Sequence, residues 1–161
     1  MAFTPLVWML INILLPFNAG TCDKYSNITE PWRNKLYTST SFTGFPKGDE
    51  HLVGKWWRFT GIGGDRIITA CLTGNRAGGH YTTHFAFTYP TNESETVEEG
   101  TAYGDVASCS QYSIPMQVVL CPGGFYIYKP TRQPHSYLVH ATCKPLIRLP
   151  AEQPERDSQL R

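Results

Sequence analysis

The stretch YTTHFAFTY, residues 81–89, carries the pattern that decides the fold class. Successive side chains of a β-strand point to opposite faces, so alternate residues of this stretch share a face. Four of the five residues on one face are aromatic, whereas the other face carries small residues and His84. We therefore expect a strand with one buried face and one face that is wet or thinly covered. The aromatic face would consist of Tyr81, Thr83, Phe85, Phe87 and Tyr89.

Short runs of β-branched and aromatic residues also occur on both sides of this stretch, and helical periodicity is almost absent. Pro122-Gly123-Gly124 lies between two such runs and predicts a hairpin. The acidic residues 92–100 lack the alternation and predict an exposed loop. The sequence predicts an all-β fold, a small disulfide-stapled β-sandwich-like domain with hairpins and little helix. Further strands are expected at residues 55–60, 66–72, 116–121, 125–129 and 136–143.

Residues 1–20 have the features of a secretory signal peptide. The apolar run from Leu6 to Leu15 contains no charge, and its length suits a signal-peptide core but is too short to cross a bilayer. Small residues at 18–20 precede the expected cleavage site, which would leave Thr21 as the first mature residue. Pro5 and Pro16 bracket the run and disfavour a buried N-terminal helix of a cytosolic protein.

The rest of the chain predicts one secreted domain and no membrane anchor. Residues 21–143 fit a single domain, and the polar, proline-bearing residues 144–161 predict a flexible tail. No later segment resembles a membrane span or a lipid-anchor signal. The net charge of +1, with scattered lysine and arginine, argues against a nucleic-acid partner.

Five cysteines follow the expected signal peptide. In an oxidising compartment they should form disulfides, and the odd number leaves one thiol over. No C-x-x-C motif occurs, which disfavours a zinc ribbon or a redox motif. The spacing alone leaves the pairing open. The five residues are Cys22, Cys71, Cys109, Cys121 and Cys143.

Three motifs occur in a fixed order: CDKYSNITEPWR at 22–33, WWRFTGIGG at 56–64 and CPGGFYIY at 121–128. Together they resemble the cysteine-rich, eight-cysteine domain of the family of uromodulin, the zymogen-granule membrane glycoprotein and liver zona-pellucida proteins. The resemblance covers roughly residues 22–143. This region does not include the polymerising zona-pellucida module of the family, so the resemblance does not imply filament formation. It marks as structural residues Trp32, Arg33, Trp56, Trp57, Arg58, Gly123 and Gly124.

The resemblance also implies a disulfide pairing. The family's connectivity would join Cys22 to Cys121 and Cys71 to Cys109 and leave Cys143 unpaired. Because Cys143 follows an apolar run, we expect a buried, unreactive thiol; an intermolecular disulfide that makes a dimer and a thiol capped by a small molecule remain alternatives. Related domains usually have more cysteines, and the corresponding positions here hold Asp49, Ala77, Tyr103, Ser110 and Leu138.

Two N-x-[ST] sequons predict glycosylation at Asn27 and Asn92, the alternative being unmodified asparagines in turns. In the family that the motifs resemble, microbial adhesins recognise such glycans. The family's mannose-bearing site corresponds here to residues 85–88, which form no sequon. That role therefore does not transfer residue by residue.

No arrangement of residues predicts catalysis, a cofactor or a metal site. The chain contains no G-x-S-x-G, no H-E-x-x-H and no phosphate-binding loop, so we expect no enzyme; a small hydrolase is the least favoured alternative. His80 and His84 would share a strand face but lie about 13 Å apart, too far for one metal ion. Both are expected to be surface histidines.

Two aromatic–basic pairs are expected to support the fold. Arg58 would share a strand face with Trp56 and stack on a neighbouring ring, the alternative being core packing with an ordinary charged edge. Trp32 and Arg33 form the second pair, and we expect the two pairs to build one structural cluster.

The sequence therefore predicts a secreted, N-glycosylated binding or display module in extracellular fluid, with host defence as the favoured role. Its partner would be an extracellular protein or a microbial adhesin that recognises the glycans. A soluble ligand or modulator of a cell-surface receptor is the alternative from a different functional class.

Overall fold

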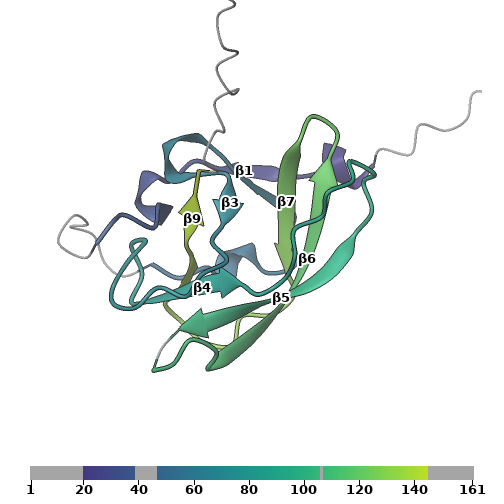
Figure 1. Cartoon of the computed structure of the whole chain (residues 1–161). Helices are drawn as coiled ribbons and strands as arrows, with labels where there is room; N and C mark the ends of the chain where they lie inside the picture. The colour runs from purple at the N-terminus through teal and green to yellow at the C-terminus, as the bar shows by residue number, and fades with distance from the viewer. Residues whose placement is uncertain (1–19, 39–46, 106, 145–161) are drawn as a thin grey trace, which may run out of the picture.

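The computed structural model describes residues 20–38, 47–105 and 107–144 (Figure 1). The expected signal peptide and the expected tail lie outside the described residues, apart from Gly20 and Lys144. Within the described ranges, the helices are short 3-10 turns: η1 (Thr21–Asp23), η2 (Pro31–Arg33), η3 (Glu50–Leu52) and η4 (Gly61–Gly63). None of them qualifies as a membrane-spanning helix.

The strands form one large curled sheet and one small sheet, which confirms the all-β prediction (Figure 1). The large sheet has the order β1-β2-β7-β6-β5-β4-β8, and β3 pairs with β9 in the small one. The strands of the large sheet are β1 (Ser26–Ile28), β2 (Trp57–Phe59), β4 (Tyr81–Phe85), β5 (Glu98–Asp105), β6 (Tyr112–Cys121), β7 (Phe125–Pro130) and β8 (Leu138–His140). Those of the small sheet are β3 (Arg66–Ile67) and β9 (Thr142–Cys143).

The predicted hairpin at Pro122-Gly123-Gly124 is confirmed. β6 and β7 are antiparallel with Cys121 opposite Phe125, so the turn joins them directly. Gly123 and Gly124 have φ angles of 91° and 74°, a region that glycine enters at no steric cost. The turn chemistry therefore fixes the register of the two central strands.

Both faces of this hairpin are buried, because alternate residues pack into different clusters. Val118 and Tyr128 belong to the main core, together with Phe59 and Phe85. Val119, Cys121 and Ile127 pack with Cys22 in a second cluster on the opposite side of the strands. A third cluster contains Ile68, Ala77, Val139 and Ala141.

The prediction of a loop over residues 92–100 is wrong at its C-terminal end, because β5 begins at Glu98. β5 pairs with β6 along its length, and the amide of Gln117 donates to the Glu99 carboxylate at 2.7 Å. Ala102 in the same strand is fully buried. Pairing of residues 98–100 with β6 thus overrides the acidic local composition.

The strand predicted over residues 81–89 ends at Phe85. Phe87 and Tyr89 nevertheless pack against the main core, as their face was expected to do. The opposite face is covered more fully than expected, because Thr82 is buried and its hydroxyl donates to the Leu72 carbonyl at 3.3 Å.

Other predicted strands are shorter or divided. The run at 66–72 contributes only β3, and the run at 136–143 is divided at Ala141 into β8 and β9, which join different sheets. The runs at 55–60, 116–121 and 125–129 contain β2, the second half of β6 and most of β7. β1 and β5 were not predicted as strands, because their sequences lack apolar alternation.

Candidate functional site

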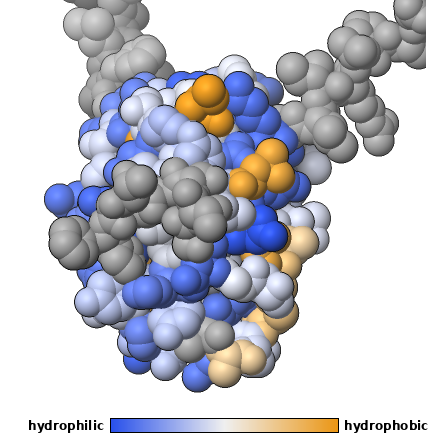
Figure 2. Space-filling model, turned by 90° about the vertical axis from the view of Figure 1, so that its left-hand side faces the viewer, coloured by the Kyte–Doolittle hydropathy of each residue, from blue (hydrophilic) through white to orange (hydrophobic). Residues whose placement is uncertain are grey.

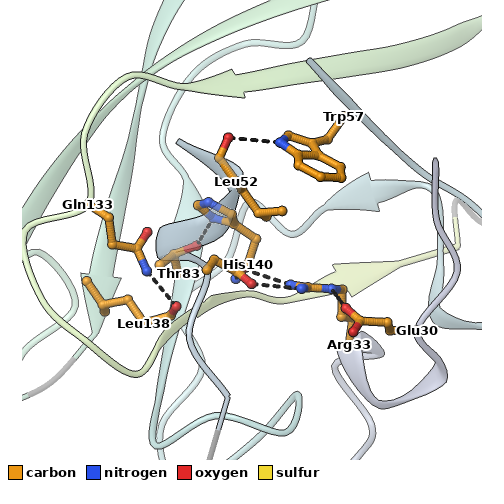
Figure 3. A network of polar contacts seen from close by, with 9 residues as sticks. Glu30, Arg33, Leu52, Trp57, Thr83, Gln133, Leu138 and His140 are labelled. Atoms are coloured by element: carbon orange, nitrogen blue, oxygen red, sulfur yellow. Dashed lines mark hydrogen bonds and ion pairs between the residues drawn. The ribbon is translucent and has the colours of Figure 1, made fainter. Parts of the chain in front are cut away.

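A buried ion pair joins three segments that are distant in sequence (Figure 3). Arg33, at the end of η2, donates two hydrogen bonds of 2.7 Å to the two carboxylate oxygens of Asp49. Arg33 is 1% exposed and Asp49 is not exposed. Asp49 also accepts from the backbone N–H of His140 in β8 at 2.7 Å, and its own N–H donates to the Leu138 carbonyl at 3.0 Å. This bidentate pair therefore ties η2 and β8 to the segment before η3.

The electrostatics of this network favour both charges. Burial alone would lower the pKa of Arg33, but the Asp49 and Glu30 carboxylates hold it above its usual value. Burial alone would raise the pKa of Asp49, but the two hydrogen bonds and the charge of Arg33 keep it below its usual value. The side chain of Glu30 is 41% exposed and adds a second acceptor, 2.7 Å from Arg33 Nε. The pair thus remains ionised inside the domain.

Thr83 and His140 form a hydroxyl–imidazole contact beside the ion pair (Figure 3). Thr83 Oγ1 and His140 Nδ1 are 2.6 Å apart, and both residues are about 1% exposed or less. Burial lowers the pKa of His140 to about 4, with the Asp49 charge opposing this shift and Arg33 adding to it. The imidazole is neutral at physiological pH and shielded from solvent. This arrangement gives a substrate no access, so the contact belongs to the core.

Two glycines allow the η4 loop to approach this region closely. A Cβ on Gly63 would lie 2.4 Å from the Glu30 carbonyl oxygen, and one on Gly64 would lie within 3 Å of the Cys143 backbone. The Gly63 carbonyl accepts from Asn34 Nδ2 at 3.1 Å and from Thr142 Oγ1 at 2.9 Å. The glycines of the second motif therefore serve close backbone packing.

The β6–β7 hairpin is joined to the N-terminal segment by the Cys22–Cys121 disulfide. The guanidinium of Arg58 lies 3.9 Å from the centre of the Phe125 ring, and it donates to Tyr25 Oη at 3.3 Å. The expected stacking of Arg58 on a neighbouring ring is confirmed. We call these five residues, Cys22, Tyr25, Arg58, Cys121 and Phe125, the hairpin end.

A hollow of about 410 Å³ opens at the hairpin end. Arg58 and Phe125 line one part of it, and the Gly123-Gly124 turn and Lys144 line others. Asp65 contributes a single carboxylate, so the lining carries more positive than negative charge. The surface at this place suits an anionic or polar ligand better than an apolar one.

The second disulfide joins Cys71 to Cys109, and Cys143 is a free thiol. Both disulfides and the free cysteine are those that the resemblance implies. Cys143 is half-buried, and burial raises the pKa of its thiol, an effect that Lys35 opposes. A raised pKa means little thiolate and low reactivity at neutral pH.

The two aromatic–basic pairs do not form one cluster. Arg33 lies 4.4 Å from the centre of the Trp32 ring, whereas Arg58 is at the hairpin end. Trp32 packs on the third hydrophobic cluster, Trp56 on the second and Trp57 on the main core. The three tryptophans thus each serve a different part of the fold.

The two histidines of the H-x₃-H pattern have separate surroundings. His84 in β4 lies 3.0 Å from a carboxylate oxygen of Asp105 in β5, whereas His80 is exposed and contacts the rings of Tyr81 and Tyr137. Burial raises the pKa of Asp105, and the hydrogen bond from His84 opposes this. His84 is therefore more enclosed than a surface histidine.

Both sequon asparagines are exposed. Asn27 is in β1, an edge strand, where it is the register partner of Arg58 in β2. Asn92 lies before β5, and the next residue, Glu93, accepts from the N–H of Gly123 at 3.0 Å. Both sequons thus flank the hairpin end.

A separate hollow of about 500 Å³ contains two apolar side chains that are unusually exposed. Leu36 is 74% exposed and Ile62 is 67% exposed, and Asn34 and Tyr37 also line the hollow. Figure 2 shows that hydrophobic patches on the face in view are small and separated by hydrophilic surface. Scattered apolar residues are normal, but two at one hollow can contact a partner.

Sequence reasoning missed Asp49 and His140 as partners of Arg33. The family resemblance implies that Asp49 and Leu138 stand where related domains have cysteines, and the Asp49 N–H donates to the Leu138 carbonyl at 3.0 Å. The replacement of these cysteines was the signal that could have indicated the network. Where two neighbouring segments have lost a disulfide, another interaction has to hold them together. The sequence separations of 16 and 91 residues hid the network from local patterns.

Comparison with known proteins identifies uromodulin-like relatives. A family model described as a uromodulin-like domain matches residues 57–143. Uromodulin of Mus musculus is 32% identical over 121 residues, which is 75% of this chain and 18% of that protein, and uromodulin of Rattus norvegicus is 31% identical over the same shares. The pancreatic secretory granule membrane major glycoprotein GP2 of Homo sapiens is 24% identical over 75% of this chain and 22% of its own length. The chain spans about a fifth of the length of these relatives.

Proposed function

Because the chain belongs to the uromodulin-like domain family, we propose that it is a secreted, N-glycosylated module that binds partners and displays glycans in extracellular fluid, in host defence. The name of the GP2 relative describes a glycoprotein of a secretory granule membrane, which supports passage through the secretory pathway. A disulfide-bonded domain is suited to that oxidising route.

The placement of the two sequons carries the proposal. Asn27 lies beside Arg58, and Asn92 is next to the residue that binds the hairpin turn, so glycans on both would border the same hollow. A glycan on Asn27 would also cover the free edge of β1, which otherwise offers unpaired backbone groups to other chains. The hairpin end would thus present two glycans on a rigid, disulfide-bonded base.

The first experiment measures glycan occupancy. The full chain is expressed in secretory cells, and the intact mass is compared with and without peptide N-glycosidase treatment. We expect Asn27→Gln and Asn92→Gln each to remove one glycan mass. Asn75→Gln, at an exposed asparagine outside any sequon, should remove none. Unchanged mass in both sequon variants would contradict the proposal.

The second experiment tests recognition. Glycosylated chain, immobilised on a sensor surface, is exposed to a mannose-binding fimbrial adhesin and then compared with chain that has been enzymatically deglycosylated. We expect binding to be lost with the glycans and to fall in each sequon variant but not in Asn75→Gln. Equal binding before and after deglycosylation would remove the glycan from the mechanism and favour a protein-mediated contact.

The exposed pair Leu36 and Ile62 favours the second candidate function, a ligand or modulator of a cell-surface receptor. Apolar side chains that line one hollow supply contact area that a protein partner can bury. Leu36→Asp with Ile62→Asp should abolish saturable binding to receptor-bearing cells while leaving adhesin binding intact. The matched control is Val97→Asp, another exposed apolar residue, outside that hollow.

The state of Cys143 decides whether the module forms a disulfide-linked dimer. The half-buried thiol with a raised pKa supports an unreactive cysteine over a disulfide-linked dimer. Non-reducing mass spectrometry of the secreted chain should give the monomer mass, whereas a doubled mass that Cys143→Ser abolishes would establish the dimer.

A further inference from the structure

Three potential metal ligands meet where the Cys71–Cys109 disulfide lies against the ends of β4 and β5, and Cys109 is bonded to one of them. The Sγ atom of Cys71, a ring nitrogen of His84 and a carboxylate oxygen of Asp105 all lie within 4.8 Å of one another. Cys109 is not part of this group, but its Sγ is bonded to Cys71 Sγ at 2.02 Å and so lies beside it. The proposed function uses none of these side chains.

We propose that the reduced form of this chain, with Cys71 and Cys109 as free cysteines, binds one zinc ion through Cys71, Cys109, His84 and Asp105. The disulfide and the metal are alternative occupants of the same place. Two cysteines, one histidine and one carboxylate provide the four sulfur, nitrogen and oxygen ligands that Zn²⁺ takes in tetrahedral sites.

Three of the four proposed ligands already lie close together, so only the second cysteine has to be repositioned around the ion. Bond lengths of about 2.0–2.3 Å to zinc place neighbouring tetrahedral ligands about 3.3–3.8 Å apart. His84 Nδ1 is already 3.0 and 3.1 Å from the two oxygens of Asp105. The sulfur atoms must separate once their bond is broken, and Cys109 lies on an exposed turn that can yield.

The site also has an opening and a rigid part. A hollow of about 160 Å³ is lined by Cys71, Cys109 and Asp105, so an ion or a reductant can reach the sulfurs from solvent. The side chains of His84 and Asp105 are only 12% and 4% exposed and are held on paired strands. Strand-held ligands keep their positions when the disulfide opens.

The exchange balances in two steps. A dithiol reductant gives two electrons and two protons to the Cys71–Cys109 bond, which breaks to two thiols while the reductant's sulfurs join in a disulfide. Zn²⁺ then displaces the two thiol protons, which leave to solvent, and binds two thiolates, neutral His84 and ionised Asp105. Zinc therefore stabilises the reduced form, and oxidation of the cysteines expels it.

The test uses cobalt as a spectroscopic stand-in for zinc. The full secreted chain carrying Cys143→Ser is reduced with a water-soluble phosphine. The phosphine is then removed under anaerobic conditions, and the reduced chain is titrated with Co²⁺. We expect the visible bands of tetrahedral cobalt and a thiolate-to-cobalt charge-transfer band, saturating at one ion per chain and bleached by Zn²⁺. Peptide mapping should show that Cys22–Cys121, whose Cys121 is fully buried, stays intact.

Matched variants separate this site from adventitious thiol binding. His84→Ala and Asp105→Asn should each weaken cobalt binding by about tenfold or more, whereas His80→Ala, at the exposed histidine of the same pattern, should leave it unchanged. His84→Cys should restore tight binding. Absence of the bands, or equal affinity in His84→Ala and His80→Ala, would overturn the proposal.

A second readout needs no variant at the metal ligands. In the reduced chain, zinc should slow alkylation of Cys71 and Cys109 by about tenfold or more while Cys143 reacts at an unchanged rate. If Cys71 and Cys109 are alkylated at the same rate with and without saturating zinc in a folded chain, the proposed site is wrong.

Discussion

Two arginines, Arg33 and Arg58, lie in regions that the domain holds together by different means. Arg33 is buried and joins three segments through a bidentate ion pair with Asp49. Arg58 is half-buried at the hairpin end, where a disulfide makes the attachment and the guanidinium stacks on Phe125 and donates to Tyr25 Oη. A buried charge is strongly unfavourable without its partner, whereas an exposed one loses little. We therefore expect the same residue type to contribute strongly to stability in one region and little in the other.

The two regions also differ in what can disturb them. A disulfide carries no proton and acts largely by restricting the unfolded chain. The Arg33–Asp49–His140 network depends on the protonation states of its members. We therefore expect the hairpin end to respond to reductants and the buried network to respond to acid.

The largest effect is expected when the hairpin end loses its disulfide. Cys22→Ala with Cys121→Ala opens a loop of 99 residues, and the chain-entropy treatment gives a loss of about 4.7 kcal/mol in the free energy of unfolding. Urea unfolding of the double variant against the parent chain measures this. A loss below about 1 kcal/mol would show that the second cluster holds the hairpin without the disulfide.

Breaking the buried ion pair should cost almost as much. Asp49→Asn keeps the size and an acceptor for the His140 N–H but removes the charge that Arg33 needs, so we expect a loss of about 3–5 kcal/mol. The matched control is Glu30→Gln, the same change at the exposed partner of the same arginine.

For Glu30→Gln we expect a loss of at most about 1 kcal/mol. Urea unfolding of both variants at neutral pH gives the comparison directly. Equal losses for Asp49→Asn and Glu30→Gln would mean that burial does not determine how much each ion pair contributes to the free energy of unfolding.

Sequence patterns found the parts of this fold that depend on local geometry. Gly123 and Gly124 supply φ values that few other residues adopt, so the hairpin could be predicted. β5 could not, because the pairing of Glu98 and Glu99 with β6 depends on neighbours rather than on their own propensity. The partnership of Arg33 with Asp49 depends on tertiary structure in the same way. The disulfide pairs followed from the family resemblance, since five cysteines alone leave the choice open.

Acid should weaken the buried network before it affects the hairpin end. The folded pKa of His140 is about 4 and the unfolded value about 6.5, so between these values the unfolded chain binds more protons. Its contribution is therefore complete above pH 6.5 and falls as the pH drops towards 4, by about 3 kcal/mol in total.

The pH experiment is urea unfolding between pH 7 and pH 5. This window lies above the pH range in which carboxylates ordinarily titrate. In that lower range, the lowered pKa of Asp49 and the raised pKa of Asp105 change the free energy of unfolding in opposite directions. His140→Asn keeps an amide that can pair with the Thr83 hydroxyl as donor or acceptor, and it should flatten the slope. An undiminished slope in that variant would assign the proton uptake to other groups.

The smallest effect is expected at Arg58. Arg58→Met keeps the length of the side chain and removes the charge above Phe125, so we expect a loss of about 0.5–1 kcal/mol, the usual value of a cation–π contact near the surface. Arg132→Met, at an exposed arginine, is the matched control and should change the free energy of unfolding by less than about 0.5 kcal/mol. Combining Arg58→Met with Phe125→Leu in a double-mutant cycle isolates the stacking energy. A coupling of about 3 kcal/mol or more, on the order of a broken buried pair, would place Arg58 in the same class as Arg33 and remove the contrast between the two regions.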